Sequence, residues 1–368
     1  MNQYFIIFAI HTNYLSVKNK IFRFLLLVVS ISGLASCSTD LDITGEKKEV
    51  LVAYGILDAS TKTQYIKINR AFLGDGNALE YSMIPDSTLY PYLLDVTLDI
   101  IKDGTVIKHY VADTVNIYKE SDNFFTGYHP YYRLILDDYT TNPFSGDTVW
   151  LNTDYTYRLT IVDPVTGNIY ESEAPGMSKL SLTTPNPSAI SLSFYTESIG
   201  NIKFNSTLNG KLYEAKFLFH YYEVFDSNPS DTIEHVMEWT LGSVVSESIL
   251  GNEALVIKYN NWDFYYQLQK KLEVRDDVTR FPGYMDVIVT VGAEDLNTYI
   301  DVNQPSNSII QEKPTFSNIT NGIGLFTSKY TYRRSKYKIN SQTVQLLING
   351  EYTNDLNFQD YWPNFPLH

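Results

Sequence analysis

Short runs of alternating hydrophobic and polar residues dominate the chain from residue 50 onward. Residues 155–161 alternate strictly, and residues 65–69 and 96–100 follow the same period of two. This period places successive side chains on opposite faces of a β-strand. Turn signals such as Asp103-Gly104 separate the runs. The pattern predicts a mainly β protein that begins, over residues 49–178, with an immunoglobulin-like β-sandwich.

Two residues near the start of the run 155–161 bear on the type of sandwich. Leu151 and Tyr155 resemble the corner of immunoglobulin-like domains, in which a tyrosine hydroxyl pins the loop before a core strand. An ordinary strand tyrosine explains the same residue equally well, so both interpretations stay open.

Proline and glycine interrupt the alternation near the middle of the chain. Pro175-Gly176 and Pro185-Asn186-Pro187 are such breaks, and we place a domain boundary there. Helical periodicity occurs only at residues 262–272 and, more briefly, at 294–302. We therefore expect a second β-rich domain, residues 179–368, that contains a few short helices.

The first residues follow a different pattern, in which cations precede an apolar run. Lys18, Lys20 and Arg23 lie just before the apolar residues 24–34. This run is about half of the roughly 20 residues that a membrane-spanning helix needs. A basic region followed by a short apolar region is typical of a secretory signal peptide, which we assign to residues 1–36.

The end of that segment, Leu34-Ala35-Ser36-Cys37, indicates lipidation. It resembles the cleavage site of bacterial lipoproteins, so we expect Cys37 to carry lipid and residues 37–48 to form a polar tether. The alternative is an ordinary signal peptide with an incidental cysteine, although the chain contains only this cysteine. With no second cysteine, disulfides and thiolate metal sites are excluded.

Charge and aromatic content narrow the possible partners. The net charge of −14 becomes −17 after cleavage, because residues 1–36 hold three cations and no acid. An acidic surface repels nucleic acid, and no nucleic-acid partner is expected. The 30 tyrosines indicate either sheet packing or an aromatic binding surface, and packing is favoured for most of them.

Candidate catalytic and metal-binding residues give little support to an enzyme. His220-x-x-Glu223 and His235-x-x-Glu238 resemble fragments of metal motifs. Side chains three apart on a strand point to opposite faces, so neither pair is expected to bind one ion. Adjacent acids also occur, at Asp137-Asp138, Asp276-Asp277 and Glu294-Asp295. We predict no catalytic residue, metal or cofactor, and a carbohydrate-active hydrolase that uses a carboxylate pair is the enzyme alternative.

One segment combines cations with aromatic residues and is the candidate binding site. Its members are Lys329, Tyr330, Tyr332, Arg334, Lys336 and Lys338. In a regular strand, all but the first share one face, and three cations make that face hard to bury. We therefore expect the face to be solvent-exposed and to dock an acidic partner or a sugar. The alternative is an edge strand whose cations prevent aggregation.

The region around residue 320 resembles a known protein family. Pro314, the tetrapeptide 316–319 (Phe-Ser-Asn-Ile) and the hexapeptide 321–326 (Asn-Gly-Ile-Gly-Leu-Phe) are similar to the run that closes a Bacteroidota lipoprotein family. That family is catalogued only as a domain of unknown function. Residues 50–56, 65–69 and 96–104 resemble its start, so the likeness covers roughly residues 37–330. This chain departs by continuing past Phe326 to residue 368.

The resemblance implies a location and a role. Members of that family are typically encoded beside TonB-dependent, SusC-like outer-membrane receptors. It implies an outer-membrane protein, on the periplasmic side or at the cell surface, that is a non-enzymatic binding or accessory partner of a nutrient-uptake receptor. A surface adhesin or scaffold is the structural alternative. The glycines at 322 and 324 indicate either a ligand-facing loop or, preferably, a tight connection that lets Ile323, Leu325 and Phe326 enter the core.

Overall fold

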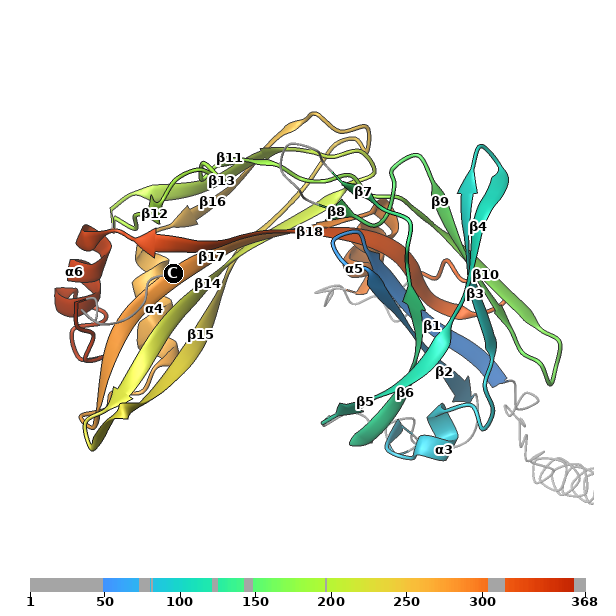
Figure 1. Ribbon diagram of the computed structural model, residues 1–368, viewed down its shortest axis with the longest axis horizontal. Coiled ribbons are helices and arrows are strands. Elements are labelled where there is room, and N and C mark those ends of the chain that lie inside the picture. Colours follow the sequence, from blue (N-terminus) through green and yellow to red (C-terminus); the bar gives the residue numbers. More distant parts are fainter. Residues whose placement is uncertain are drawn as a thin grey trace, which may run out of the picture. The chain divides into compact units, whose positions relative to one another are not determined.

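The computed structural model describes residues 49–72, 80, 82–120, 125–141, 148–195, 197–303 and 315–360 (Figure 1). The predicted signal peptide, Cys37, the tether and Pro314 lie outside the described residues. Within the described ranges, no helix combines the length and apolar character that crossing a bilayer requires.

The largest sheet has nine strands, and the protein is mainly β with several sheets, as predicted. Eight strands follow the order β15-β14-β17-β18-β1-β2-β6-β5, and β12 pairs with β18. Their bounds are β1 (Glu49–Asp58), β2 (Thr63–Phe72), β5 (Asp113–Lys119), β6 (Gly127–Ile135), β12 (Ser191–Leu192), β14 (Leu212–Phe225), β15 (Asn228–Val245), β17 (Val278–Gly292) and β18 (Ile323–Ile339).

Strand β18 joins the early and late strands of this sheet. Its residues 323–329 pair in parallel with 52–58 of β1, and its residues 329–338 pair in antiparallel with 284–292 of β17. The sheet therefore contains strands from both sides of the boundary that the sequence places near residue 179. That boundary itself stays a prediction.

Three smaller sheets accompany the large one. One has the order β10-β9-β3-β4, another β11-β13-β16, and the third pairs β7 with β8. Their bounds are β3 (Asp95–Lys102), β4 (Thr105–Val111), β7 (Thr140–Thr141), β8 (Thr148–Val149), β9 (Thr156–Val162), β10 (Ile169–Pro175), β11 (Leu182–Thr184), β13 (Ile199–Asn205) and β16 (Ala254–Asn260).

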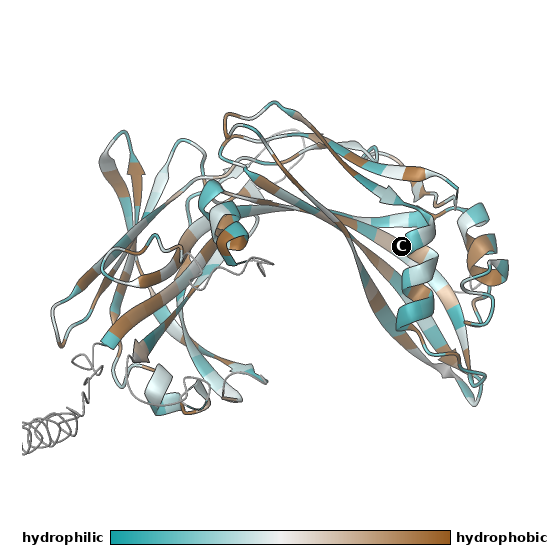
Figure 2. Ribbon diagram, turned by 180° about the vertical axis from the view of Figure 1, so that it is seen from behind, coloured by the Kyte–Doolittle hydropathy of each residue, from teal (hydrophilic) through white to brown (hydrophobic). Residues whose placement is uncertain are grey.

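The alternation seen in the sequence builds the core. In β9, Tyr157, Leu159 and Ile161 are buried while the residues between them are only half-buried. The same banding of hydrophobic and hydrophilic residues is visible along other strands (Figure 2). A buried hydrogen bond of 2.9 Å, from the Leu94 backbone N–H to the Tyr132 hydroxyl, links the segment before β3 to β6.

Four helices are described: α3 (Pro85–Thr88), α4 (Trp262–Lys271), α5 (Glu294–Asn303) and α6 (Ser341–Asn349). Helices α4 and α5 match the two predicted segments. The buried residues of α4 are Phe264, Tyr265 and Leu268. Helix α6 was not predicted. It begins after Asn340, whose side chain caps the helix by accepting the N–H of Thr343, 3.0 Å away.

Tyrosine hydroxyls pin two loops ahead of core strands. The Asn152 backbone N–H donates to the hydroxyl of Tyr157 at 2.7 Å, and the Thr207 N–H donates to that of Tyr213 at 2.8 Å. The contact between Asn152 and Tyr157 is of the kind expected for an immunoglobulin-like corner. The tyrosine that makes it is Tyr157, whereas the sequence pattern indicated Tyr155. Because Tyr157 is buried, its hydroxyl needs such a partner.

The glycines at 322 and 324 serve the tight connection into β18. Gly324 has a φ of +130°, and a Cβ there would lie 1.9 Å from the Ala53 carbonyl oxygen. The Asn318 side chain bonds to both backbone groups of Phe326, at 2.9 and 2.7 Å. Leu325 and Phe326 are buried as expected, whereas Ile323 remains largely exposed.

Candidate functional site

The predicted binding segment lies on β18, but its residues do not share one exposed face. Lys329 forms an ion pair with Asp58, with 3.2 Å between Nζ and Oδ2. Tyr330 is only 6% exposed and belongs to the core, while Tyr332 is half-buried against it. The expectation that this face is solvent-exposed is therefore wrong for Tyr330.

A β-bulge explains why buried and exposed residues do not alternate regularly along β18. Lys336 has a φ of +65°, and the pairing of β18 with β17 shifts register between Met285 and Val287. The bulge reverses the alternation, so Tyr337 is buried while Lys336 and Lys338 are exposed. An edge role is limited to residues 330–337, because β18 pairs on its other side with β1 up to Lys329 and with β12 from Lys338.

Arg334 turns toward a neighbouring segment of the chain. Its Nε donates to the Pro187 carbonyl at 3.0 Å, and its guanidinium lies 5.0 Å from the centre of the Tyr337 ring. The six predicted residues are thus divided among an ion pair, the core, a bulge and this local contact. The structure does not bring them together as one surface.

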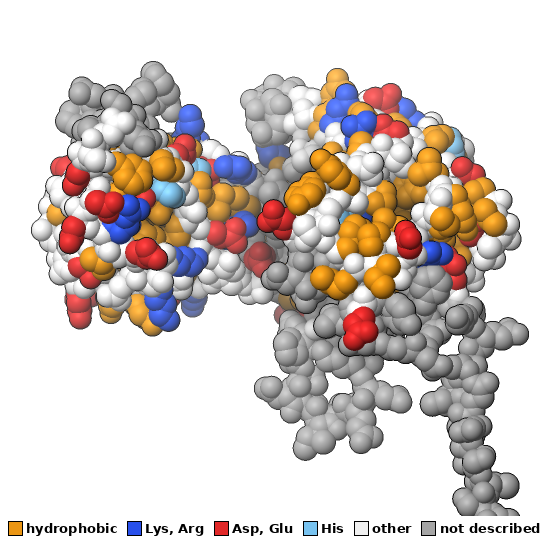
Figure 3. Space-filling model, turned by 90° about the horizontal axis from the view of Figure 1, so that it is seen from below, with side chains coloured by type: hydrophobic (Ala, Val, Ile, Leu, Met, Phe, Trp, Pro, Cys, Tyr) orange, Lys and Arg blue, Asp and Glu red, His pale blue; other side chains and the backbone are white. Residues whose placement is uncertain are grey.

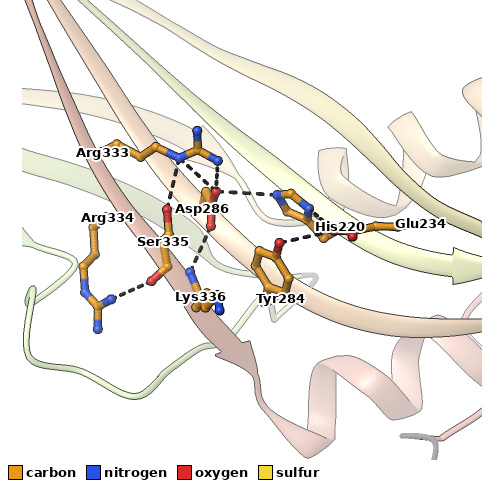
Figure 4. A network of polar contacts seen from close by, with 8 residues as sticks. All are labelled: His220, Glu234, Tyr284, Asp286, Arg333, Arg334, Ser335 and Lys336. Atoms are coloured by element: carbon orange, nitrogen blue, oxygen red, sulfur yellow. Dashed lines mark hydrogen bonds and ion pairs between the residues drawn. The ribbon is translucent and has the colours of Figure 1, made fainter. Parts of the chain in front are cut away.

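A buried aspartate holds the bulge from the adjacent strand (Figure 4). Asp286 is 0% exposed, and its Oδ1 accepts the Lys336 backbone N–H at 2.9 Å. Its Oδ2 accepts two N–H groups of Arg333, at 3.1 and 2.5 Å. Charge-assisted bonds of this kind compensate a buried carboxylate. Asp286 is therefore a structural anchor for β18.

His220 on β14 extends this network. Its Nδ1 lies 2.9 Å from Glu234 Oε1, and its Nε2 lies 3.5 Å from Asp286 Oδ2. Its ring stacks on Tyr284 with 4.0 Å between centroids (Figure 4). Burial and the charge of Glu234 raise the pKa of Tyr284 to about 12, so its hydroxyl stays protonated and donates to Glu234 at 3.2 Å.

In neither His-x-x-Glu motif does the histidine approach its own glutamate. His220 approaches Glu234 rather than Glu223, and His235 Nε2 lies 3.2 Å from Glu223 Oε2. Glu223 also accepts the Nε of Arg280 at 2.9 Å, in a pair that is buried on both sides. In the described part of the chain, no group of three or more His, Cys, Asp or Glu side chains is placed to hold a metal.

Two of the adjacent acid pairs are held by cations. Lys108, followed by Tyr110, lowers the pKa of Asp137, and Arg275 lowers that of Asp277. The general acid of a glycosidase needs a raised pKa instead. In the third pair, Asp295 accepts the side-chain amide of Asn318 at 2.8 Å.

A surface hollow of ≈ 560 Å³ is lined by segments 178–183, 205–208 and 250–252. Serine, threonine and asparagine make up most of its lining. Among the described residues that line it, Lys179 is the only one with an ionisable side chain. The hollow therefore offers hydroxyl and amide groups but no acid–base pair.

A different group of side chains forms an exposed aromatic surface, which we call the tyrosine–lysine face. Its members are Tyr54 of β1, Tyr65 and Lys67 of β2, Lys119 of β5, Tyr131 of β6 and Tyr299 of α5. Figure 3 shows hydrophobic side chains, with tyrosine counted among them, exposed in groups between cations and acids on the side seen from below.

Strand register assembles this face. Tyr65 and Lys67 alternate with the buried Gln64, Ile66 and Ile68, so they point away from the core. Tyr54 lies directly opposite Lys67 across β1 and β2. Tyr65 lies opposite Arg133, which places Tyr131 beside Lys67 on the next strand.

Ring contacts join the members into two groups, which the strand register brings together where Tyr54 lies opposite Lys67. The Tyr54 and Tyr299 rings meet edge to face at 6.0 Å between centroids, and the Tyr65 and Tyr131 rings do so at 6.4 Å. The ammonium groups of Lys67 and Lys119 lie 4.9 and 5.1 Å from the centre of the Tyr131 ring. Tyr54 and Tyr65 nevertheless remain 40% and 43% exposed.

This face was not predicted, because sheet packing explains most tyrosines of the sequence equally well. The shared parity of Tyr65 and Lys67, opposite to Ile66 and Ile68, was the available signal. Tyr131 and Lys119 join them only through the strand order β2-β6-β5.

No protein-family model matches the chain, and no curated protein sequence matches it.

Proposed function

We propose that the chain is a lipid-anchored outer-membrane protein that binds its partner or ligand through the tyrosine–lysine face. In this proposal it is not an enzyme and acts beside a TonB-dependent receptor in nutrient uptake. The observation that carries the binding role is the contiguous exposed surface around Tyr54, Tyr65 and Tyr131. Tyrosine combines apolar area with a polar tip, and it is enriched at recognition surfaces.

The location rests on the sequence. A basic segment, a short apolar run and Leu34-Ala35-Ser36-Cys37 support cleavage and lipidation at Cys37. Two or three acyl chains would anchor the protein firmly, since each buried CH₂ contributes ~0.8 kcal/mol. The likeness of residues 316–326 to the receptor-associated family supports the role in uptake.

An immunoglobulin-like sandwich over residues 49–178 is part of the same proposal. The buried alternation in β3 and β9 supports it, as does the hydroxyl of Tyr157, which accepts the Asn152 N–H ahead of a core strand. The two layers would hold the tyrosine–lysine face rigid, because β1, β2 and β6 bury their other side in the core.

Substitution of Cys37 tests the location. Cys37→Ala removes the thiol that would receive lipid, so the protein should remain uncleaved or leave the membrane fraction. Fractionation and intact mass spectrometry measure both properties. Correctly trimmed protein in the outer-membrane fraction would contradict the anchoring.

Co-purification from native membranes tests the binding role. Tyr65→Ala/Tyr131→Ala should greatly reduce recovery of a TonB-dependent receptor while the melting temperature stays within a few degrees. The matched control is Tyr118→Ala/Tyr128→Ala, since these rings also meet edge to face, at 5.4 Å, and are exposed on the opposite side of β5 and β6. Equal recovery with both double variants would refute the role of the face.

A further inference from the structure

Within the part of the chain that the structure describes, two lysines of the tyrosine–lysine face have no acidic partner. Arg133, on the same side of β6, is held by Asp113 through bonds of 2.9 and 2.5 Å. Lys67 and Lys119 form no ion pair with any carboxylate among the described residues. Two neighbouring cations thus lack a carboxylate counter-ion among the described residues, in a chain whose net charge is −14.

The two ammonium groups converge on one aromatic ring. Both lie about equally far from the centre of the Tyr131 ring, at 4.9 Å for Lys67 and 5.1 Å for Lys119. Lys67 Nζ also lies 3.3 Å from His129 Nδ1 and 3.4 Å from the Pro130 carbonyl. Each of these contacts is with a neutral group or a π-system, so none supplies the missing negative charge.

A second contact of His129 determines which of its ring nitrogens carries the hydrogen. Its Nε2 lies 2.9 Å from the Phe125 carbonyl, which can only accept, so Nε2 carries the hydrogen. Nδ1 is then the acceptor that Lys67 uses. Burial lowers the pKa of His129, and the charges of Lys67 and Lys119 lower it further, which favours the neutral ring.

The positive charges of Lys67 and Lys119 repel each other. Burial, followed by the charge of Lys119, lowers the pKa of Lys67 to about 8. An anion bound near the two ammonium groups would offset this repulsion and favour the charged form of Lys67. The site is therefore suited to an anionic group.

We propose that Lys67 and Lys119 bind the carboxylate or sulfate of an acidic saccharide whose ring packs on the exposed tyrosines of the same face. Tyr65 and Tyr54 lie beside Lys67 and offer aromatic rings to the apolar C–H side of a sugar. The inference rests on the proposed function, in which this face binds ligand.

Size and charge favour a saccharide over the other anionic occupants. A standard protein interface uses roughly 20–30 residues on each side, so these six side chains could form only part of one, whereas they suffice to contact a short saccharide. An extended membrane of anionic lipid would face the acidic surface of the protein as a whole, whose net charge is −14. A short saccharide meets mainly the local cations, because charges beyond a Debye length of about 8–10 Å are screened. A short acidic saccharide needs only a few cations and rings, which matches what the face provides.

Calorimetric titration of the full lipidated protein in detergent tests the proposal. The probes are an oligogalacturonate, a chondroitin sulfate oligosaccharide and a neutral dextran of the same length. At least one acidic probe should bind at least about tenfold more tightly than dextran, and Lys67→Gln/Lys119→Gln should remove this preference. Lys67→Arg/Lys119→Arg should keep it and also shows that the site tolerates substitution.

Lys102→Gln is the matched control, because Lys102 also lies over a tyrosine ring, 5.8 Å from that of Tyr155. This variant should bind like the parent protein. Equal affinity for acidic and neutral probes, or a preference that survives in Lys67→Gln/Lys119→Gln, would overturn the anion site while receptor recovery remains unaffected. Binding only to vesicles of phosphatidylglycerol would also overturn the saccharide assignment.

Discussion

The buried pair formed by Arg280 and Glu223 should contribute strongly to stability, and Arg280→Met tests this. Arg280 is 2% exposed, and its Nε and Nη2 lie 2.9 and 2.8 Å from Glu223 Oε1. Its Nη1 donates to the Leu356 carbonyl at 2.9 Å, which ties the segment after α6 to β17. The substitution keeps most of the side-chain volume but leaves Glu223 without its countercharge.

The expected loss is about 3–5 kcal/mol of unfolding free energy, the range for removing one partner of a buried ion pair. The double variant Glu223→Gln/Arg280→Met should recover much of this loss, because no uncompensated charge remains. The exposed pair of Arg275 with Asp277 has similar bonds of 2.9 and 2.6 Å. Arg275→Met should therefore cost far less than Arg280→Met, because solvent screens an exposed pair.

Guanidinium unfolding followed by tryptophan fluorescence measures these values. Trp239 is buried on β15, the strand that pairs with β14 and so lies beside Glu223, and it should report the loss of this sheet. A cost for Arg280→Met that equals the cost for Arg275→Met would refute the reasoning. So would a double variant that is as unstable as Arg280→Met alone.

Three further changes have distinct expected outcomes. Gly324→Ala should cost at least about 3 kcal/mol in thermal unfolding, because its Cβ would overlap the Ala53 carbonyl. Gly167 has a φ of +75° but open space around it, so Gly167→Ala should cost only about 1 kcal/mol. Asp286→Asn should lower stability by about 1–2 kcal/mol in denaturant, since it weakens the bonds to Arg333; an unchanged midpoint would contradict the anchor role. Lys67 has a pKa of about 8 when folded and 10.5 as its ordinary value, so the unfolded chain binds more protons between these limits. The melting temperature should therefore rise with pH across that window relative to Lys67→Gln, and parallel curves would contradict it.

Local periodicity predicted the strands well where the backbone is regular. Residues 156–161 and 96–100 lie in β9 and β3 with the expected buried positions. The preference for a structural role of the glycines at 322 and 324 agrees with the burial of Leu325 and Phe326. In each case the determining contacts are steric and close to the residue itself.

The predicted binding site failed where a distant partner decides the outcome. The parity argument for β18 assumed a regular strand, but Asp286 accepts the Lys336 N–H and stabilises a bulge that reverses it. Sequence spacing alone does not indicate which strand supplies that carboxylate. The tyrosine–lysine face has the same origin, because Lys67, Tyr131 and Lys119 meet only through strand order.

The pairing of β1 with β18 also sets constraints on how the chain folds. Val52 pairs with Ile323 and Asp58 with Lys329, so the first strand has its partner near the other end of the described chain. Closing so long a loop costs entropy before any contact repays it, and such topologies fold slowly. Until residues 323–329 are available, one edge of β1 has no partner. The large sheet of such a chain stays incomplete until those late residues have been synthesised.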